Sequence, residues 1–402
     1  MKTTSSSMAE TAQITQELRQ ELHKTKRRLT IGIPKEDLPE EKRLALTPEA
    51  VDMIVNAGHC ILFEKNAGSG INYPDDHYIT AGAEIASTTQ VFESDIVFKI
   101  APPTYEEISL MKNKSTICSM LQFSTFSPEA FKSMMLKKMN ALGYELLSQE
   151  GKCFPVRNSI SEIEGAASIS VAAELLSNTH GGKGVLLGGI PGVSPTEVVI
   201  VGAGTAGTVA ARAALGLGAT VKIFDNDIHK LREIQNTLGR TLFTSIFQPQ
   251  VLLNAFRSAD VAIGALPSIH SSARYLISED IVKAMKKGAL IIDLRVNQGG
   301  CFETSLPLPG SPQLFEKHGV IHYCVPNLSS RVARTTSMAL SNIFTTLIIQ
   351  LGMSRGVADM SKFSMDFRSG LYLYSGNPVN AHVAQHFGLP SYDLGLYLMG
   401  EQ

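Results

Sequence analysis

Three glycines in the run GAGTAG have the spacing of a phosphate-binding turn. Gly202, Gly204 and Gly207 follow the apolar run VVIV and precede a stretch of small residues typical of a helix. In such a turn the first glycine permits a tight bend, the second lets the backbone approach a pyrophosphate, and the third lets helix and strand pack closely. The N-terminus of the helix would add free N–H groups and a positive dipole end. The motif predicts a dinucleotide site made by Gly202, Ala203, Gly204, Thr205, Ala206 and Gly207.

An acid at the end of the second apolar run indicates which dinucleotide binds. The carboxylate of Asp225 is placed to accept hydrogen bonds from an adenosine ribose 2′-OH and to repel a 2′-phosphate. The residues therefore predict NAD rather than NADP. A glycine turn with a purely structural role is the alternative, and the register of strand, turn, helix, second strand and acid disfavours it.

The elements that position this turn alternate between strand-like and helix-like runs. Strand-like runs include LTIGI from Leu29, CILFEK, DIVFKIA and STICSML, and after Asp225 come DVAIGAL, GALIIDLRV and VIHYCVPN. Such apolar continuity is typical of strands buried on both faces, and their alternation with helices predicts doubly wound parallel sheets. The fold class expected is therefore α/β with Rossmann-like domains.

Two long helix-like stretches, 161–176 and 337–351, flank the dinucleotide region. They suggest that the chain crosses back to its first domain after completing the second. We expect a discontinuous substrate domain over 29–155 plus 335–402, with an NAD-binding domain over 156–334 inserted in it. Residues 1–28 form a polar N-terminal extension. Its few apolar residues have the spacing of one face of a helix.

Composition excludes several classes of protein. The 402 residues exceed one ordinary core, and 44% hydrophobic with 18% charged residues suits a globular protein. A formal net charge of −1 disfavours nucleic acid as a partner. We expect no signal peptide and no membrane span, since the first 28 residues lack an apolar core and the longest apolar runs have strand length.

The cysteines indicate a reducing compartment. They are scattered, with no CxxC pattern: Cys60, Cys118, Cys153, Cys301 and Cys324. This favours reduced thiols, a cytoplasmic location, and neither a disulfide framework nor a zinc site. No metal is expected elsewhere, since the acids in YPDDH are better placed to favour the start of a helix.

Further motifs carry a resemblance to a known family. They are GIP at Gly32, RLALTPEAV at Arg43, SEIEG at Ser161, the run GGKGVLLGGIPGV, NQGGCFE at Asn297 and CVPN at Cys324. Together they resemble the NAD-dependent alanine dehydrogenases and the related NAD-binding subunit of proton-translocating transhydrogenase, over nearly the whole chain from Leu29. The glycine-rich runs are more similar to the dehydrogenases.

The resemblance implies oxidative deamination of L-alanine to pyruvate and assembly into a homo-oligomer, a hexamer or a dimer. It implies that Arg43 holds the substrate carboxylate, a pairing that suits the planar guanidinium fork. It places Lys230 near the adenosine ribose and Asn327 near the nicotinamide, and it adds Ser161 and Leu266 to the cofactor site.

Three ionisable groups of the resembled family are replaced in this chain. Ala101 in KIAPP stands where the dehydrogenases have a lysine, Gln122 in SMLQF where they have a histidine, and Asn297 in NQGGCFE where they have an aspartate. Neutral amides cannot exchange a proton near neutral pH. Loss of a general acid or base alone typically lowers a rate by about 10²–10⁴-fold. We interpret the chain as a divergent paralogue.

Two residues are candidates for a substitute apparatus. Arg295 stands two positions before Asn297 on an expected strand end, which would turn both side chains the same way. His270, in the loop after DVAIGALPS, could be a relocated proton carrier. The simpler interpretations are a surface cation and an exposed loop histidine.

Three functions remain open. The first is an NAD-dependent oxidoreductase acting on a small amino or 2-oxo acid. The second is an NAD(H)-binding sensor or partner subunit without turnover, favoured by the three replaced groups. The third is a dehydrogenase for a larger substrate, in which Ala101 and Gln122 leave room and Arg295 binds a second carboxylate.

Overall fold

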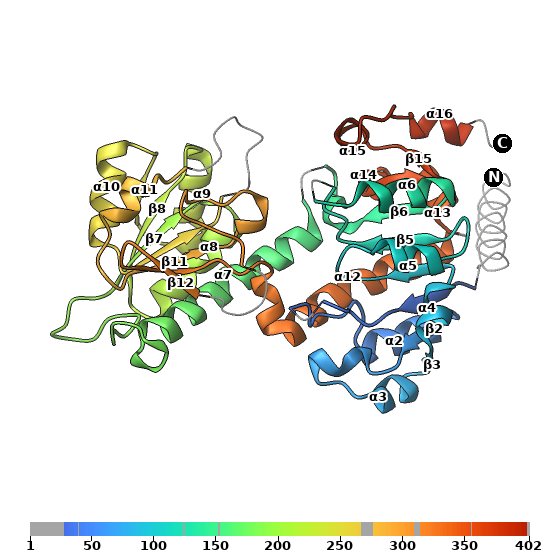
Figure 1. Ribbon diagram of the computed structural model, residues 1–402, viewed down its shortest axis with the longest axis horizontal. Coiled ribbons are helices and arrows are strands. Elements are labelled where there is room, and N and C mark those ends of the chain that lie inside the picture. The colour runs from blue at the N-terminus through green and yellow to red at the C-terminus, as the bar shows by residue number, and fades with distance from the viewer. Residues whose placement is uncertain are drawn as a thin grey trace, which may run out of the picture. The chain divides into compact units, whose positions relative to one another are not determined.

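The structure is a computed structural model that describes residues 28–38, 40–123, 125–151, 153–266, 276–308, 314–354 and 356–399 (Figure 1). The N-terminal extension, apart from Arg28, lies outside the described residues. The chain forms two compact units. Unit 1 comprises Met1–Arg157 and Ala333–Gln402, and unit 2 comprises Asn158–Val332.

Unit 1 is built on one eight-stranded sheet of order β15-β14-β6-β5-β4-β1-β2-β3. Its strands are β1 (Thr30–Ile33), β2 (Cys60–Glu64), β3 (Glu84–Ala86), β4 (Ile96–Phe98), β5 (Thr116–Ser119), β6 (Asn140–Gly143), β14 (Leu371–Tyr374) and β15 (Asn377–Pro378). The first six pair in parallel, and β14 and β15 pair antiparallel at one edge. Ser375 and Gly376, both with positive φ, make the tight turn between β14 and β15.

The helices of unit 1 come from both ends of the chain. They are α2 (Pro48–Asn56), α3 (Asp75–Thr80), α4 (Thr88–Phe92), α5 (Tyr105–Leu110), α6 (Pro128–Leu136), α12 (Ala333–Met353), α13 (Val357–Phe363), α14 (Met365–Ser369), α15 (Ala381–His386) and α16 (Leu394–Met399). The short helical turns are η1 (Ala67–Ile71) and η2 (Tyr144–Leu146).

Unit 2 contains a seven-stranded sheet of order β12-β13-β11-β10-β7-β8-β9. Its strands are β7 (Glu197–Val201), β8 (Thr220–Phe224), β9 (Phe243–Ser245), β10 (Val261–Gly264), β11 (Leu290–Asp293), β12 (Leu314–Lys317) and β13 (Val320–Tyr323). Its helices are α8 (Thr205–Gly216), α9 (Ile228–Leu238), α10 (Pro249–Ser258) and α11 (Glu279–Lys283), with turns η3 (Asn178–His180), η4 (Val296–Gln298) and η5 (Leu328–Val332). Among the described pairings of this second sheet, only the one between β12 and β13 is antiparallel.

Both faces of the unit 2 sheet are buried. Alternate residues of β7 belong to two different apolar clusters: Val198 and Ile200 pack with α8, and Val199 and Val201 pack with α10. This is the physical reason for the continuous apolar runs in the sequence. The α/β class with Rossmann-like sheets is confirmed; the antiparallel edge strands add to the predicted parallel pattern.

Each sheet has a point where the strand order reverses. In unit 1 the chain runs from β1 outward to β2 and β3, then returns to β4 on the other side of β1. In unit 2 it runs from β7 to β8 and β9, then returns to β10 on the other side of β7. Open α/β sheets bind ligands at the carboxyl ends of their strands at such switch points. Residues that follow β1, β4, β7 and β10 are therefore the first candidates for a site.

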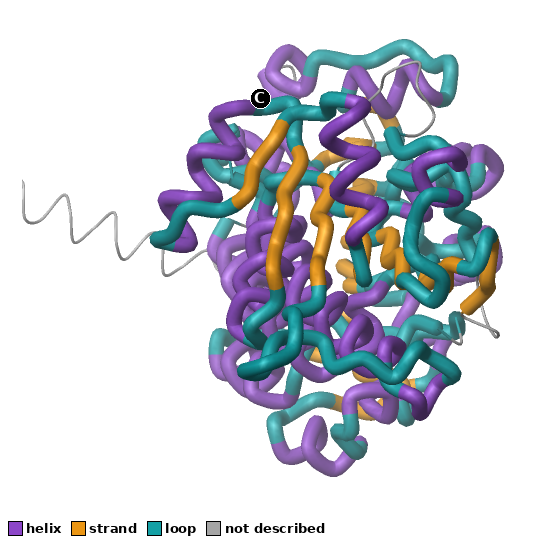
Figure 2. The backbone as a smooth tube through the Cα atoms, turned by 90° about the vertical axis from the view of Figure 1, so that its left-hand side faces the viewer, coloured by secondary structure: helices purple, strands orange, loops and turns teal. Residues whose placement is uncertain are grey.

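The two long helices both lie at the unit boundaries. The chain enters unit 2 within α7 (Pro155–Leu176) and returns to unit 1 at the start of α12. The smooth tube of Figure 2 shows the same elements from a second direction, with helices against the strands. Among the described residues one helical stretch, Leu328–Met353, is long and apolar enough to cross a membrane, but 56% of its tested window is buried inside the fold.

That burial is typical of a core helix. In unit 1, Ser337 Oγ of α12 accepts a hydrogen bond from Leu44 N–H at 2.8 Å, and Ser341 Oγ accepts one from Thr47 N–H at 3.0 Å. The helix thus holds the segment that carries Arg43. The length and apolar composition of this helix are therefore weak evidence that it spans a membrane.

Candidate functional site

The glycine turn follows β7 and has the geometry of a dinucleotide cradle. Gly202 has φ +115°, and a Cβ there would lie 2.8 Å from the carbonyl carbon of Ala265. A Cβ on Gly207 would lie 1.9 Å from Gly202 O, so only glycine allows the helix to start this close to the strand. A Cβ on Gly204 would meet nothing within 4 Å. Gly204 therefore borders open space, as a turn that admits a pyrophosphate requires.

The start of α8 completes this cradle. Gly204 is the N-cap and supplies no side-chain hydrogen bond to the first turn, which begins Thr205-Ala206-Gly207. Uncapped N–H groups and the positive end of the helix dipole suit the phosphates of a dinucleotide. The residues present fit NAD at this turn.

Asp225 follows β8 and is 4% exposed. Its Oδ2 accepts a hydrogen bond from Ala203 N–H at 2.8 Å, and its Oδ1 accepts one from Asp227 N–H at 2.9 Å. The carboxylate thus ties the glycine turn to the end of β8. Each oxygen keeps a further lone pair, so the ribose role is compatible with this second, structural role.

The other predicted cofactor residues lie on the same edge of the unit 2 sheet. Leu266 follows β10, is buried, and accepts a weak hydrogen bond from Cys301 Sγ at 3.8 Å. Lys230 is partly buried in the first turn of α9. Asn327 has φ +58° and its carbonyl accepts from Ser330 N–H at 2.8 Å at the start of η5. His270 lies outside the described residues.

Arg295 contacts the predicted cofactor serine. Its Nη2 donates to Ser161 Oγ at 3.3 Å, and its Nη1 lies 4.0 Å from Glu164 Oε2, both on α7 within unit 2. Its Nε is buried and has no hydrogen-bond partner among the described residues. The Arg295 side chain is only 19% exposed and contacts α7, so a surface cation is the wrong description.

The strand-face argument for Arg295 and Asn297 does not hold. Strand β11 ends at Asp293, and Asn297 lies in the 3₁₀ turn η4. The buried Asp293 carboxylate accepts from Arg295 N–H at 3.0 Å, from Cys301 N–H at 2.7 Å and from Ser305 Oγ at 2.6 Å. These hydrogen bonds hold the residues after β11 in a loop around Asp293. The alternation of side chains between the two faces of a strand therefore ends before Arg295.

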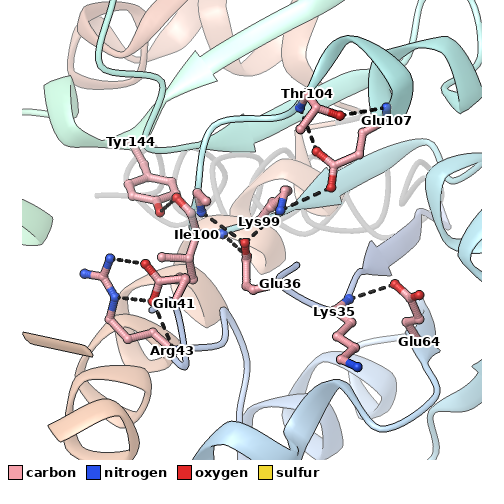
Figure 3. A network of polar contacts seen from close by, with 11 residues as sticks. Lys35, Glu36, Glu41, Arg43, Glu64, Lys99, Ile100, Thr104, Glu107 and Tyr144 are labelled. Atoms are coloured by element: carbon pink, nitrogen blue, oxygen red, sulfur yellow. Dashed lines mark hydrogen bonds and ion pairs between the residues drawn. The ribbon is translucent and has the colours of Figure 1, made fainter. Parts of the chain in front are cut away.

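A buried ion-pair network occupies the switch point of unit 1 (Figure 3). Lys99 Nζ lies 2.7 Å from Glu36 Oε2 and 3.2 Å from Glu107 Oε1, and all three side chains are less than 10% exposed. Glu36 also accepts from the N–H groups of Ile100, at 2.6 Å, and Ala101, at 3.3 Å. The network therefore joins the segment after β1 to the segment after β4, where Ala101 lies.

The charges of this network are set by burial and by each other. Burial raises the pKa of Glu36 and of Glu107. Burial of Lys99 opposes its charge, but the attraction of the two carboxylates outweighs this and raises the pKa of the ammonium. Lys99 thus stays charged and is held by Glu36 and Glu107.

Arg43 is oriented by a carboxylate two residues away. Its Nε donates to Glu41 Oε1 at 2.7 Å and its Nη2 to Glu41 Oε2 at 2.5 Å, with both side chains 2% exposed (Figure 3). Glu41 Oε1 also accepts from Arg43 N–H at 3.0 Å. One edge of the guanidinium fork is therefore bound within the chain, which fixes the plane of the other edge.

Gln122 follows β5 in a strained backbone conformation, with φ +45°. Its N–H donates to Glu145 Oε1 at 3.0 Å, and its side-chain amide lies 3.1 Å from Met120 Sδ. Glu145 lies in η2, directly after β6, and the same Oε1 accepts from Tyr372 Oη of β14 at 2.5 Å. Arg43, Ala101 and Gln122 thus all lie on loops of unit 1, and the last two follow adjacent strands.

Several functional candidates were missed by sequence reasoning. Glu36, Glu41 and Glu145 are acids that follow or lie near the carboxyl ends of strands, a position that would have signalled them. Glu164 and Tyr372 carried no local signal, because their partners are far away in the chain. Two further polar residues have structural contacts: His322 is a hydrogen-bonded core residue, and Arg331 pairs with Glu174.

Fold and turn together define a class of protein. Two doubly wound α/β units, one carrying a glycine turn that fits a dinucleotide at its switch point, are typical of dinucleotide-dependent oxidoreductases. Comparison with known proteins identifies the family within that class. Residues 32–164 match the family model described as "Alanine dehydrogenase/PNT, N-terminal domain", and residues 168–381 match "Alanine dehydrogenase/PNT, C-terminal domain".

Relatives and solved structures agree with this match. Alanine dehydrogenase of Bacillus subtilis (strain 168) is 35% identical over 362 residues, covering 90% of this chain and 95% of the relative. Alanine dehydrogenase of Methanococcus maripaludis is 36% identical over 366 residues, covering 90% and 97%. A solved L-alanine dehydrogenase has a TM-score of 0.84 at 32% identity and covers 90% and 99%. A transhydrogenase from Sinorhizobium meliloti, at 22% identity and a TM-score of 0.72, shares the fold.

The chain belongs to the alanine dehydrogenase/PNT family. The resemblance inferred from its motifs is confirmed, and with it an oxidoreductase that uses NAD(H).

Proposed function

We propose that this protein interconverts a small amino acid and its 2-oxo acid with NAD, with L-alanine and pyruvate as the first pair to test. The observation that carries the proposal is the buried Arg43 fork, held in plane by Glu41 in unit 1 of a chain whose unit 2 fits NAD. A carboxylate is the ligand that such a fork binds in two-point geometry. We further propose that the protein is cytoplasmic and acts as a homo-oligomer.

Residues of unit 2 would hold the cofactor. The turn from Gly202 to Gly207 and the start of α8 bind the pyrophosphate, and Asp225 accepts from the adenosine ribose. Lys230 would lie near the same ribose and Asn327 near the nicotinamide, and Ser161 and Leu266 would also contact the cofactor. Bound NAD supplies the hydride acceptor for the Cα–H bond of the amino acid.

Residues of unit 1 would bind and orient the substrate. Glu41 accepts from Nε and Nη2 of Arg43 and so fixes the plane of the guanidinium, which we propose as the group that binds the substrate carboxylate. Lys99 is committed to Glu36 and Glu107, and we do not assign it to the substrate. Ala101 is smaller than the lysine of the resembled family, and Gln122 is neutral where that family has a histidine. These changes would let the site accept related amino and 2-oxo acids, including those with a second carboxylate.

A second function is favoured by Ala101, Gln122 and Asn297. None of these three side chains can exchange a proton near neutral pH. An NAD(H)-binding sensor or partner subunit without turnover needs no such exchange. The two functions differ in whether any 2-oxo acid consumes NADH.

The deciding experiment measures NADH consumption with pyruvate and ammonium, using protein already shown by thermal shift to bind NADH. The variant Arg43→Lys keeps a cation for Glu41 but loses the planar fork. We expect it to lower kcat/KM by about 10²-fold, since a charge-assisted pair contributes about 1.5–3 kcal/mol, and to leave the NADH affinity unchanged.

Turnover that is unaffected by Arg43→Lys would contradict the carboxylate role of Arg43. Absence of turnover with pyruvate and with a panel of other 2-oxo acids, on protein that binds NADH, would favour the sensor function instead.

A further inference from the structure

One carboxyl group in unit 1 is only half satisfied. Glu145 Oε1 accepts hydrogen bonds from Gln122 N–H at 3.0 Å and from Tyr372 Oη at 2.5 Å. Its Oε2 is buried and has no hydrogen-bond partner among the described residues. A buried polar atom without a partner costs free energy, so its presence calls for a role beyond holding the loop.

The surroundings are built to accommodate this carboxyl group. A Cβ on Gly143 would lie 2.5 Å from Tyr372 Cε1 and 3.0 Å from Glu145 Oε1, so only glycine leaves room for the pair. Gln122 is held at φ +45°, a conformation that is strained for a residue with a side chain. Strain of this kind persists where surrounding contacts over-determine it, and Glu145 provides one of them.

Among the residues that the structure describes, no ion pair involves Glu145. Its contacts are two hydroxyl or amide groups, Tyr372 Oη and Gln122 N–H, together with backbone N–H groups of Leu121 and of Glu145 itself. The titratable groups that face it are the phenols of Tyr372, from β14, and Tyr144, from η2, and burial raises the pKa of both phenols. Neither phenol carries charge near neutral pH.

We propose that Glu145 holds the proton that the reaction exchanges, taking over at Oε2 the role for which Gln122 lacks an ionisable group. This inference rests on the proposed function. It assigns the missing acid–base chemistry to a residue whose carboxyl contacts the backbone of Gln122 itself. Burial also raises the pKa of Glu145, which brings its proton exchange closer to neutral pH.

The proton balance of deamination is consistent with one such group. Once Cα has lost hydride to the nicotinamide, water adds to the iminium: a C–O bond forms, one O–H bond breaks, and that proton moves to Glu145 Oε2. The same proton then passes to the amine nitrogen, the C–N bond breaks, and ammonia leaves with the electron pair. The hydroxyl proton of the new carbonyl returns to Glu145 and is released to solvent.

Two variants test the proposal. Glu145→Gln keeps the shape and removes the ionisation, and we expect kcat to fall by about 10²–10⁴-fold while NADH affinity is retained. Tyr372→Phe removes a hydrogen bond that favours the carboxylate form, so we expect the ionisation in the pH–rate profile to move to higher pH. Glu93→Gln, an exposed glutamate elsewhere in unit 1, is the matched control and leaves both unchanged.

A readout without activity separates the two proposals. In ¹³C NMR of protein labelled at glutamate side chains, the resonance absent from Glu145→Gln titrates above the usual glutamate range and shifts upward in Tyr372→Phe. Turnover whose pH profile is the same in the wild type and Tyr372→Phe would overturn the role of Glu145 and leave the proposed function standing. The raised NMR titration without turnover on any 2-oxo acid would overturn both, and a normal titration would overturn the role of Glu145 alone.

Discussion

Among single residues, Asp225 has a structural role shown by its hydrogen bonds and a recognition role that we propose. Its carboxylate accepts hydrogen bonds from Ala203 N–H of the glycine turn and from Asp227 N–H beyond β8. In the proposed function the same carboxylate also accepts from the adenosine ribose. A neutral amide can still accept hydrogen bonds at this position but no longer repels a phosphate. Charge and acceptor geometry can therefore be separated by one substitution.

We predict that Asp225→Asn reduces the preference for NADH over NADPH by about 10-fold or more, because the electrostatic penalty on a 2′-phosphate disappears. Fluorescence titration gives the dissociation constants of both cofactors. Asp227→Asn, which changes the cap of α9 two residues away, serves as the control and keeps the preference. Tighter binding of NADPH than NADH by the wild type would contradict the role of Asp225.

A second residue-scale prediction concerns His322, which is fully buried in β13. Its Nε2 lies 2.8 Å from Thr304 Oγ1 and its Nδ1 3.0 Å from Val320 O, and burial lowers the pKa of His322 to about 4 from 6.5. Between these values the unfolded chain binds more protons, so stability present above pH 6.5 is lost as the pH falls toward 4. We predict a loss of roughly 3 kcal/mol over this window.

Urea unfolding across this pH window measures the effect, and His322→Gln should flatten the part of the curve that belongs to this residue. His77→Gln, in the exposed start of α3, is the control. Identical pH dependence in the wild type and His322→Gln would show that the histidine is not the group responsible.

At the element scale, two glycines of one turn have opposite constraints. Gly207 lies against the carbonyl of Gly202, and Gly204 borders open space. Gly207 is required by the packing of α8 on β7, and we propose that Gly204 is required by the approach of the pyrophosphate.

We predict that Gly204→Ala weakens NADH binding by about 10-fold or more with little change in stability, because the new methyl group enters the space needed by the pyrophosphate. Gly207→Ala should instead lower the free energy of unfolding by about 1–3 kcal/mol, since the backbone must shift. Thermal unfolding and NADH titration on both variants give the two quantities. A stable Gly207→Ala, or unchanged binding in Gly204→Ala, would contradict this division.

At the scale of the whole molecule, each unit has its own sheet, switch point and buried polar network. The network of Lys99, Glu36 and Glu107 belongs entirely to unit 1, and the cofactor turn belongs entirely to unit 2. Stability and cofactor affinity should therefore respond to different substitutions.

We predict that Lys99→Met destabilises the protein by about 3–5 kcal/mol, because two carboxylates are left buried without their cation, and leaves the NADH affinity of the folded protein unchanged. Calorimetric unfolding and NADH titration below the transition test this. Lys65→Met, at an exposed site of unit 1, is the control. A parallel loss of NADH affinity would show that the two units are energetically coupled.

Features that depend on neighbours in the chain were predictable from the amino-acid sequence. The glycine turn, the acid at Asp225, the apolar strands and the family resemblance all arise from local spacing, since a period of two or a tight turn is encoded within a few residues. The parallel character of the sheets could be predicted in this way, but the antiparallel strands at their edges could not, because no local pattern marks them.

Which polar groups contact one another became known from the three-dimensional fold. The Glu145–Tyr372 contact joins residues 227 positions apart, and Lys99 meets a glutamate 63 positions away. No local pattern predicts such pairs, because they form where distant strands end at one edge of a sheet. Burial at that edge then makes the pairing decisive, since a charge or carboxyl oxygen removed from water must find a partner or carry a proton.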